Sequence, residues 1–264
     1  MSRYLEQDVL PPLGALCLDY TDDIHRPPGD PLNPESFHFP LIHETIHNAT
    51  LWKVVNSQEY PEEFIQSIAD ACKRLAERGA VGVITSCGFL AQIQKKIAGR
   101  IPIPIATSSL LQIPLLLTMR PENEHIGVIT FDSETLGNAH FEGIGITCDL
   151  RKRITVIGCT PSGPLRGIIQ RGEPYVHEEL EKELVSRAKV LVEHDPLVSV
   201  IVLECTQMPP YARAISQATG LPVYDVIPMI DWFYSGLKPK FVKEDIHKED
   251  AKRARVRSEK ELSK

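Results

Sequence analysis

Two cysteines of this chain stand where a nucleophile or a base would be useful. Cys87 follows the apolar run at residues 81–85, and Cys205 follows the apolar run at residues 198–203. Short apolar runs of this kind predict buried strands. In parallel sheets, ligands bind beyond the carboxyl ends of the strands. The sequence therefore predicts that both thiols face a binding site.

Two opposed thiols have a chemical use at a carbon acid. One thiolate takes a proton from carbon and the other thiol returns a proton to the opposite face, which inverts a stereocentre without a cofactor. The enediolate that develops needs hydrogen-bond donors aimed at it. Gly88, with an open backbone N–H, and Thr206, with an N–H and a hydroxyl, stand directly beside the cysteines. The pattern predicts proton transfer at carbon.

An internal repeat relates the two cysteines. Residues 14–20 resemble residues 127–133, and each segment precedes one of the cysteines by a similar interval. A proline within an apolar frame, Pro104 or Pro222, then follows each cysteine at the same interval. Matches in the same order at a nearly constant offset indicate a duplicated unit. The duplication would place the two thiols on opposite walls of one cleft.

Apolar runs alternate along the chain with amphipathic stretches, which is typical of an α/β fold with parallel sheets covered by helices. With the repeat, this predicts two pseudosymmetric Rossmann-like lobes and an active site between them. The expected strands are 13–18, 81–85, 103–106, 126–131, 154–157, 198–203 and 223–226, and the expected helices are 61–77, 89–98, 134–143, 175–193 and 209–220.

The predicted first lobe comprises residues 10–119 and 221–237, and the predicted second lobe comprises residues 120–220. Residues 238–264 form a basic tail that we expect to be solvated. The segment between Asp22 and Pro40 is rich in proline, aspartate and histidine and predicts a long loop. Arg26 and Asp30 are candidate binding residues within it, although a purely structural loop fits as well.

Composition restricts the class of protein. The chain has 264 residues, 42% of them hydrophobic and 24% charged, and a formal net charge of −6, as in an ordinary globular protein. The acidic body argues against nucleic acid as a partner. No apolar run reaches the roughly 18 residues of a membrane span, and the polar N-terminus lacks the apolar stretch of a signal peptide. We therefore expect a cytoplasmic protein with reduced cysteines.

Other kinds of site have no support in the sequence. No CxxC pair or HExxH spacing predicts a metal site, and no glycine-rich phosphate loop or lysine motif for pyridoxal phosphate stands out. We expect neither a metal nor a cofactor. Cys17, Cys72, Cys148 and Cys159 have no partner in the repeat or lie on apolar stripes, so we interpret them as structural.

At the two cysteines the sequence resembles the aspartate/glutamate racemase superfamily, which includes hydantoin racemases, arylmalonate decarboxylase and maleate isomerase. The resemblance rests on the segments TSCG at 85–88 and ECT at 204–206, and on the duplicated frame across residues 10–237. It implies two pseudosymmetric α/β lobes, chemistry without a cofactor, and catalytic roles for Cys87 and Cys205.

The sequence departs from the amino-acid racemases of that superfamily in ways that affect the substrate. Gly88 and Phe89 follow Cys87 where those racemases usually carry Asn and Thr, and Gln207 stands where they often carry Glu. The groups that would hold an amino acid's carboxylate are missing at the first site, which argues against aspartate or glutamate. Decarboxylase relatives keep one thiol, so the pair here favours racemisation or isomerisation.

We expect an isomerase independent of pyridoxal phosphate: a racemase or epimerase that acts next to the carboxylate or carbonyl of a small carboxylate or hydantoin-like substrate. A cis–trans isomerase similar to maleate isomerase and a two-lobed small-molecule-binding protein are the alternatives. Neither nucleic acid nor membrane is an expected partner, and a homo-oligomer is left open. The expected substrate-binding residues are Asp19, Ser86, Gly88, Phe89, Ser108, Asp132, Ser133, Thr206 and Gln207. Turn capping is the alternative role for Asp19, Asp132 and Ser133, and helix capping for Ser108.

Overall fold

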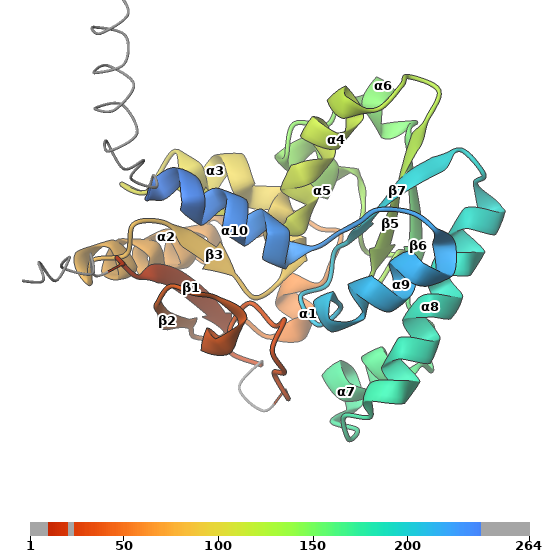
Figure 1. The fold of residues 1–264 in the computed structure, drawn as a ribbon. Helices are drawn as coiled ribbons and strands as arrows, with labels where there is room; N and C mark the ends of the chain where they lie inside the picture. Colours follow the sequence, from red (N-terminus) through yellow and green to blue (C-terminus); the bar gives the residue numbers. More distant parts are fainter. Residues whose placement is uncertain (1–9, 21–23, 239–264) are drawn as a thin grey trace, which may run out of the picture.

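The computed structural model describes residues 10–20 and 24–238, which form two parallel four-stranded sheets (Figure 1). The strand order is β2-β1-β3-β4 in the first sheet and β6-β5-β7-β8 in the second, so the second lobe repeats the first. This confirms the predicted fold class. The strands are β1 (Leu13–Leu18), β2 (Leu41–Ile46), β3 (Val83–Thr85), β4 (Ile105–Ala106), β5 (His125–Thr130), β6 (Ile154–Gly158), β7 (Val198–Leu203) and β8 (Val223–Tyr224).

The central strands are the most apolar segments of the chain because both of their faces are covered. Every residue of β1 and β3 is buried, as is nearly every residue of β5 and β7. Strand β2 was not among the expected strands. It lies at the edge of its sheet with only one fully buried residue, and Glu44 within it pairs with Arg74 and Arg78. A polar edge strand lacks the continuous apolar run of a central one.

The helices cover the faces of both sheets. Helix α2 begins after Pro61, carries Glu62 and Glu63 at its positively charged end, and buries an apolar stripe that includes Cys72. The helices are α1 (Leu51–Val54), α2 (Glu62–Glu77), α3 (Gln94–Ala98), α4 (Ile113–Met119), α5 (Asn138–Gly143), α6 (Cys148–Arg151), α7 (Pro164–Arg171), α8 (His177–His194), α9 (Ala212–Thr219) and α10 (Val226–Leu237). The described residues also form four short 3-10 helices: η1 (Pro34–Ser36), η2 (Gly88–Ile93), η3 (Ser109–Gln112) and η4 (Pro209–Tyr211).

The last helix returns the chain to the first lobe. Helix α10 packs over the first sheet, where Met229 and Ile230 are buried against Leu13 and Ala15 of β1 (Figure 1). Strand β8, however, pairs with β7 in the second sheet. The predicted assignment of residues 221–237 to the first lobe is therefore corrected: β8 belongs to the second lobe, and only α10 belongs to the first.

The predicted basic tail lies outside the described residues except for Lys238. Within residues 10–20 and 24–238, no helix has both the length and the apolar character needed to cross a membrane.

Candidate active site

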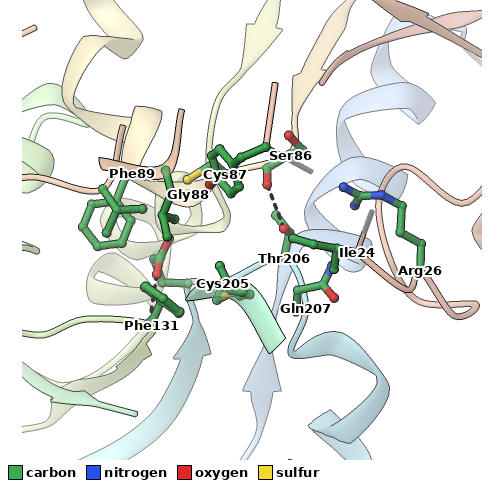
Figure 2. A pocket seen from close by; sticks show the side chains of 15 residues that line it. Ile24, Arg26, Ser86, Cys87, Gly88, Phe89, Phe131, Cys205, Thr206 and Gln207 are labelled. Atoms are coloured by element: carbon green, nitrogen blue, oxygen red, sulfur yellow. Dashed lines mark hydrogen bonds between the residues drawn. The ribbon is translucent and has the colours of Figure 1, made fainter. Parts of the chain in front are cut away.

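Cys87 and Cys205 line one pocket between the two sheets (Figure 2). Cys87 lies two residues beyond β3 and precedes η2, and Cys205 lies two residues beyond β7. The repeated architecture therefore brings together the two thiols that the sequence singled out. Of the expected substrate-binding residues, Ser86, Gly88, Phe89, Thr206 and Gln207 also line this pocket.

Each thiol accepts a hydrogen bond from the backbone two residues further along the chain. The N–H of Phe89 donates to the sulfur of Cys87, and the N–H of Gln207 donates to the sulfur of Cys205. Donors of this kind stabilise a thiolate and lower its pKa. The two halves of the repeat thus give both sulfurs the same backbone hydrogen bond.

Burial opposes that support in both thiols. Loss of solvation, followed by the nearby Glu204 carboxylate, raises the pKa of Cys87 to about 12. The same two causes raise the pKa of Cys205 well above its usual value. Both cysteines are therefore protonated near neutral pH, and any thiolate that forms in this pocket is a strong base.

Cys87 has one further partner that Cys205 lacks. The side chain of Tyr20 hydrogen-bonds to the Cys87 sulfur, and this contact lowers the pKa of the thiol. Burial raises the pKa of Tyr20 well above its usual range, so the tyrosine is protonated. Tyr20 was not among the residues expected from the sequence; its signal there is its place just after β1, directly following Asp19.

Glu204 is a fixed carboxylate in the pocket wall. Its Oε2 accepts a hydrogen bond from the Thr130 hydroxyl at 2.8 Å and one from the Phe131 N–H at 3.3 Å. Its other oxygen lies against Gly88, where an added Cβ would collide with it. The side chain is 1% exposed, and burial raises the pKa of Glu204 to about 7. The sequence motif contained Glu204, but only the fold shows that its carboxylate lies at the pocket.

Two of the expected binding side chains tie the lobes together. The hydroxyl of Thr206 donates to the backbone oxygen of Ser86 at 2.9 Å, and the Gln207 amide donates to Asp30. The Ser86 hydroxyl accepts from the N–H of Leu18 at 3.3 Å. Thr206 and Gln207 therefore join the two lobes at the pocket, and the Ser86 hydroxyl joins two segments of the first lobe.

Asp19 and Ser108 do not line the pocket. The exposed Asp19 carboxylate accepts the N–H of Asn48 at 2.7 Å, which joins the segment after β1 to the segment after β2. The Ser108 hydroxyl accepts the N–H of Leu110 at 3.2 Å and caps η3. The structure thus shows the capping arrangement that was the alternative for Ser108, whereas Asp19 makes a long-range contact.

Asp132 and Ser133 also lie outside the pocket lining. Asp132 pairs with Arg166 at 3.0 Å and accepts the N–H of Glu134 at 3.0 Å. Ser133 is exposed and packs against Gly158 of β6. The residue of this loop that does reach the pocket is Phe131.

A cation lines the pocket on another side. The Arg26 guanidinium reaches the pocket from the proline-rich loop and pairs with Asp30, whose two oxygens both lie 3.0 Å from Nη1. Asp30 is 1% exposed and also accepts the N–H of Leu32 at 2.7 Å. These contacts hold Arg26 in place within the described part of the loop.

The pocket is narrow. Its cavity volume is about 30 Å³, which is room for about two water molecules. Within residues 10–20 and 24–238, no group of three or more His, Cys, Asp or Glu side chains is arranged to hold a metal ion.

No family model matches the chain. Curated relatives of the chain carry the name dimethylsulfoniopropionate lyase. The relative from Durusdinium sp. clade D is 31% identical over 242 residues, which cover 89% of this chain and 79% of the relative. Lyase 7 of Emiliania huxleyi is 29% identical over 88% of this chain and 69% of the relative. These relatives are enzymes, but their names indicate lyases and not isomerases.

Solved structures show the fold. Unliganded arylmalonate decarboxylase aligns with a TM-score of 0.51 at 17% identity, covering 88% of this chain and 94% of that one. Aspartate racemase from Picrophilus torridus aligns with a TM-score of 0.52 at 14% identity, covering 89% and 96%. The expected superfamily resemblance is confirmed at the level of the fold. By its identity to the Durusdinium enzyme across most of both chains, this protein belongs to the dimethylsulfoniopropionate lyase family, on a racemase-type fold.

Proposed function

We propose that this protein cleaves dimethylsulfoniopropionate by removing a proton from the carbon next to the carboxylate. The observation that carries the proposal is the pair of thiols, Cys87 and Cys205, in one buried pocket of a chain whose relatives are named for this substrate. The proposal keeps the expected chemistry, proton transfer at a carbon acid, and replaces the expected reaction class.

The reaction needs one strong base. A thiolate takes a proton from the carbon next to the carboxylate, and the electron pair of that C–H bond becomes the new carbon–carbon double bond. The bond between the neighbouring carbon and sulfur breaks, and its electron pair leaves with sulfur. The products are acrylate and neutral dimethyl sulfide. The proton carried by the cysteine then passes to solvent and restores the base.

A sulfonium leaving group explains how a fold shared with racemases can support a lyase. Inversion of a stereocentre requires a second acid to return a proton, whereas dimethyl sulfide leaves as a neutral molecule and needs no proton. One thiol is then the base. The other stays protonated and lines the pocket opposite it.

Arg26 is suited to hold the substrate carboxylate. Negative charge grows on that carboxylate as the proton leaves, so a cation placed there stabilises the transition state more than the ground state. The Arg26 guanidinium lines the pocket, and its ion pair with the buried Asp30 fixes its position.

A two-base racemase or epimerase is the second candidate. The observation that favours it is the matched support of the two sulfurs by the N–H groups of Phe89 and Gln207. That symmetry suits two thiols that exchange the roles of acid and base.

Single cysteine variants separate the two candidates. If the protein is a lyase, the variant that lacks the basic thiol, Cys87→Ala or Cys205→Ala, should lose at least about a thousandfold in rate. The other variant should lose less. A two-base racemase should lose inversion in both variants. Dimethyl sulfide release measured by gas chromatography and chirality measured by polarimetry report the two reactions. Cys148→Ala, at an exposed cysteine outside the pocket, is the matched control. Full activity in both pocket variants would rule out a thiol base.

A further inference from the structure

The pocket carries opposite charges at its two ends. In Figure 2, Arg26 lies on one side of the pocket and Gly88 and Phe131 on the other, with Cys87 and Cys205 between them. Glu204 belongs to the second side, because its carboxylate contacts Gly88 and the N–H of Phe131. A ligand that spans the pocket therefore meets a cation at one end, the thiols in the middle and an acidic group at the other end.

The Glu204 carboxyl group cannot leave its place. Thr130 and Phe131 hold one of its oxygens, and the backbone at Gly88 confines the other. A buried carboxylate is unfavourable unless it is paired with a positive charge. Within the described part of the chain, no basic side chain is among the groups that act on Glu204. Among the described residues, the Glu204 carboxylate therefore has no positively charged partner.

Aromatic residues form part of the pocket lining. Phe89 and Phe131 are among the lining residues beside Glu204, and Tyr20 lines the wall beside Cys87. The Phe89 ring packs edge-on against His140, and the Arg166 guanidinium lies 5.3 Å from the centroid of the Phe131 ring. Ring faces attract cations, most strongly where water is excluded. An onium ion, sulfonium or quaternary ammonium, has a diffuse positive charge and apolar methyl groups. An apolar wall that contains one carboxylate therefore suits an onium ion better than it suits a strongly hydrated ammonium ion.

We propose that Glu204 is the counter-ion for an onium group, and that the pocket selects zwitterions with a carboxylate at Arg26 and an onium group at Glu204. This inference rests on the proposed lyase function and deepens it by naming the substrate class, the β-onium carboxylates. The acidic carbon of such a molecule lies between its two charges and so falls beside the thiols. A dicarboxylate such as aspartate would bring a second negative charge against Glu204.

The pH dependence follows from the ionisation of Glu204. The acidic groups that face it are Cys87, Cys205, Cys159, Tyr20, Tyr60 and Asp132. Burial raises the pKa of each cysteine and tyrosine in this set far above neutrality, so they carry no charge at neutral pH. Asp132 is paired with Arg166 at 3.0 Å. Because burial raises the pKa of Glu204 to about 7, onium binding should weaken as the pH falls below about 7, by up to about tenfold per unit.

Two probes of nearly equal shape test the proposal. One is 3-(trimethylammonio)propanoate, and the other is 4,4-dimethylpentanoate, in which carbon replaces the charged nitrogen. Calorimetry on the full chain at about pH 8 should show the onium probe binding at least about tenfold tighter than its neutral isostere. Glu204→Gln should abolish or reverse this preference. Glu181→Gln, at a half-exposed residue of α8, is the matched control and should keep it.

Equal preference in the wild type and in Glu204→Gln would overturn the proposal. If the variant does not fold, the pH dependence of the wild type tests the proposal. Its preference for the onium probe over the neutral isostere should shrink at about pH 6. A preference that does not change with pH would contradict a role for Glu204. Failure of the proposed function gives a different result. The protein would then prefer the onium probe through Glu204 but would release no dimethyl sulfide from dimethylsulfoniopropionate. Release of dimethyl sulfide without a preference for the onium probe would contradict the role of Glu204 and leave the proposed lyase function intact.

Discussion

At the scale of single residues, the two thiols occupy equivalent positions with unequal surroundings. Both sulfurs accept a backbone N–H, from Phe89 or Gln207, but only Cys87 also meets the Tyr20 hydroxyl. The repeat predicts the first contact because both cysteines follow a strand in the same way. It does not predict the second, because the side chain at the end of β1 differs from its counterpart in the other lobe.

Tyr20→Phe should slow alkylation of Cys87. The variant removes the donor that lowers the pKa of Cys87, so the pKa rises and the thiolate fraction at a given pH falls. A shift of one pKa unit corresponds to about tenfold less thiolate. The rate of reaction with iodoacetamide at about pH 8, followed by mass spectrometry, reports this fraction. Tyr224→Phe on β8 is the control, and an unchanged rate in Tyr20→Phe would contradict the assigned contact.

Gly88→Ala should damage both the pocket and the fold. The added Cβ would meet the side chain and the backbone oxygen of Glu204, and the backbone cannot swing aside. Overpacking of this kind costs about 1–3 kcal/mol, and urea unfolding measures it. At Gly236, in helix α10, an added Cβ has nothing within 4 Å. Gly236→Ala should therefore stabilise the protein by roughly 0.5–1 kcal/mol, and equal effects of the two variants would refute the packing argument.

At the scale of elements, the strands were predicted well where both faces are buried. β1, β5 and β7 fall close to the expected ranges because a covered strand is apolar throughout. β2 has a polar, partly exposed pattern and gave no such signal. The expected helix at 89–98 is instead η2 followed by α3, since Gly88–Ile93 winds tightly after Cys87.

The start of helix α10 makes a stability prediction. The Asp225 side chain accepts the N–H of Ile227 at 2.7 Å, and burial raises the pKa of Asp225 to about 6. A carboxyl group with a raised pKa in the folded state stabilises the protein at low pH, and this contribution is lost as pH rises through about 6.

Asp225→Asn keeps a side-chain oxygen for the cap but cannot ionise. Its stability relative to the wild type should therefore improve as the pH rises from about 4 to about 8, by at most about 3 kcal/mol. Urea unfolding at several pH values checks this, and comparing pH values cancels any constant effect of the amide. A difference that does not vary with pH would contradict the assigned burial of the charge.

At the scale of the whole molecule, hydrogen bonds between segments far apart in the sequence hold the two lobes together. The Ser109 hydroxyl donates to the backbone oxygen of Leu203 at 2.7 Å, and Gln112 donates to the backbone oxygen of Asp225 at 2.9 Å. The repeat could predict two lobes that face each other. It could not predict these contacts, or the burial of Glu204 and the approach of Arg26, because they arise only when distant segments pack.

The central claim is that this two-lobed pocket performs an elimination at a carbon acid. The most direct measurement is proton NMR of dimethylsulfoniopropionate incubated with the full chain. The account predicts acrylate and dimethyl sulfide in equal amounts, with loss of both products in the variant that lacks the basic thiol, Cys87 or Cys205. The elimination would be contradicted if dimethylsulfoniopropionate stayed unchanged while the same protein inverted a chiral carboxylate. That result would favour the two-base racemase.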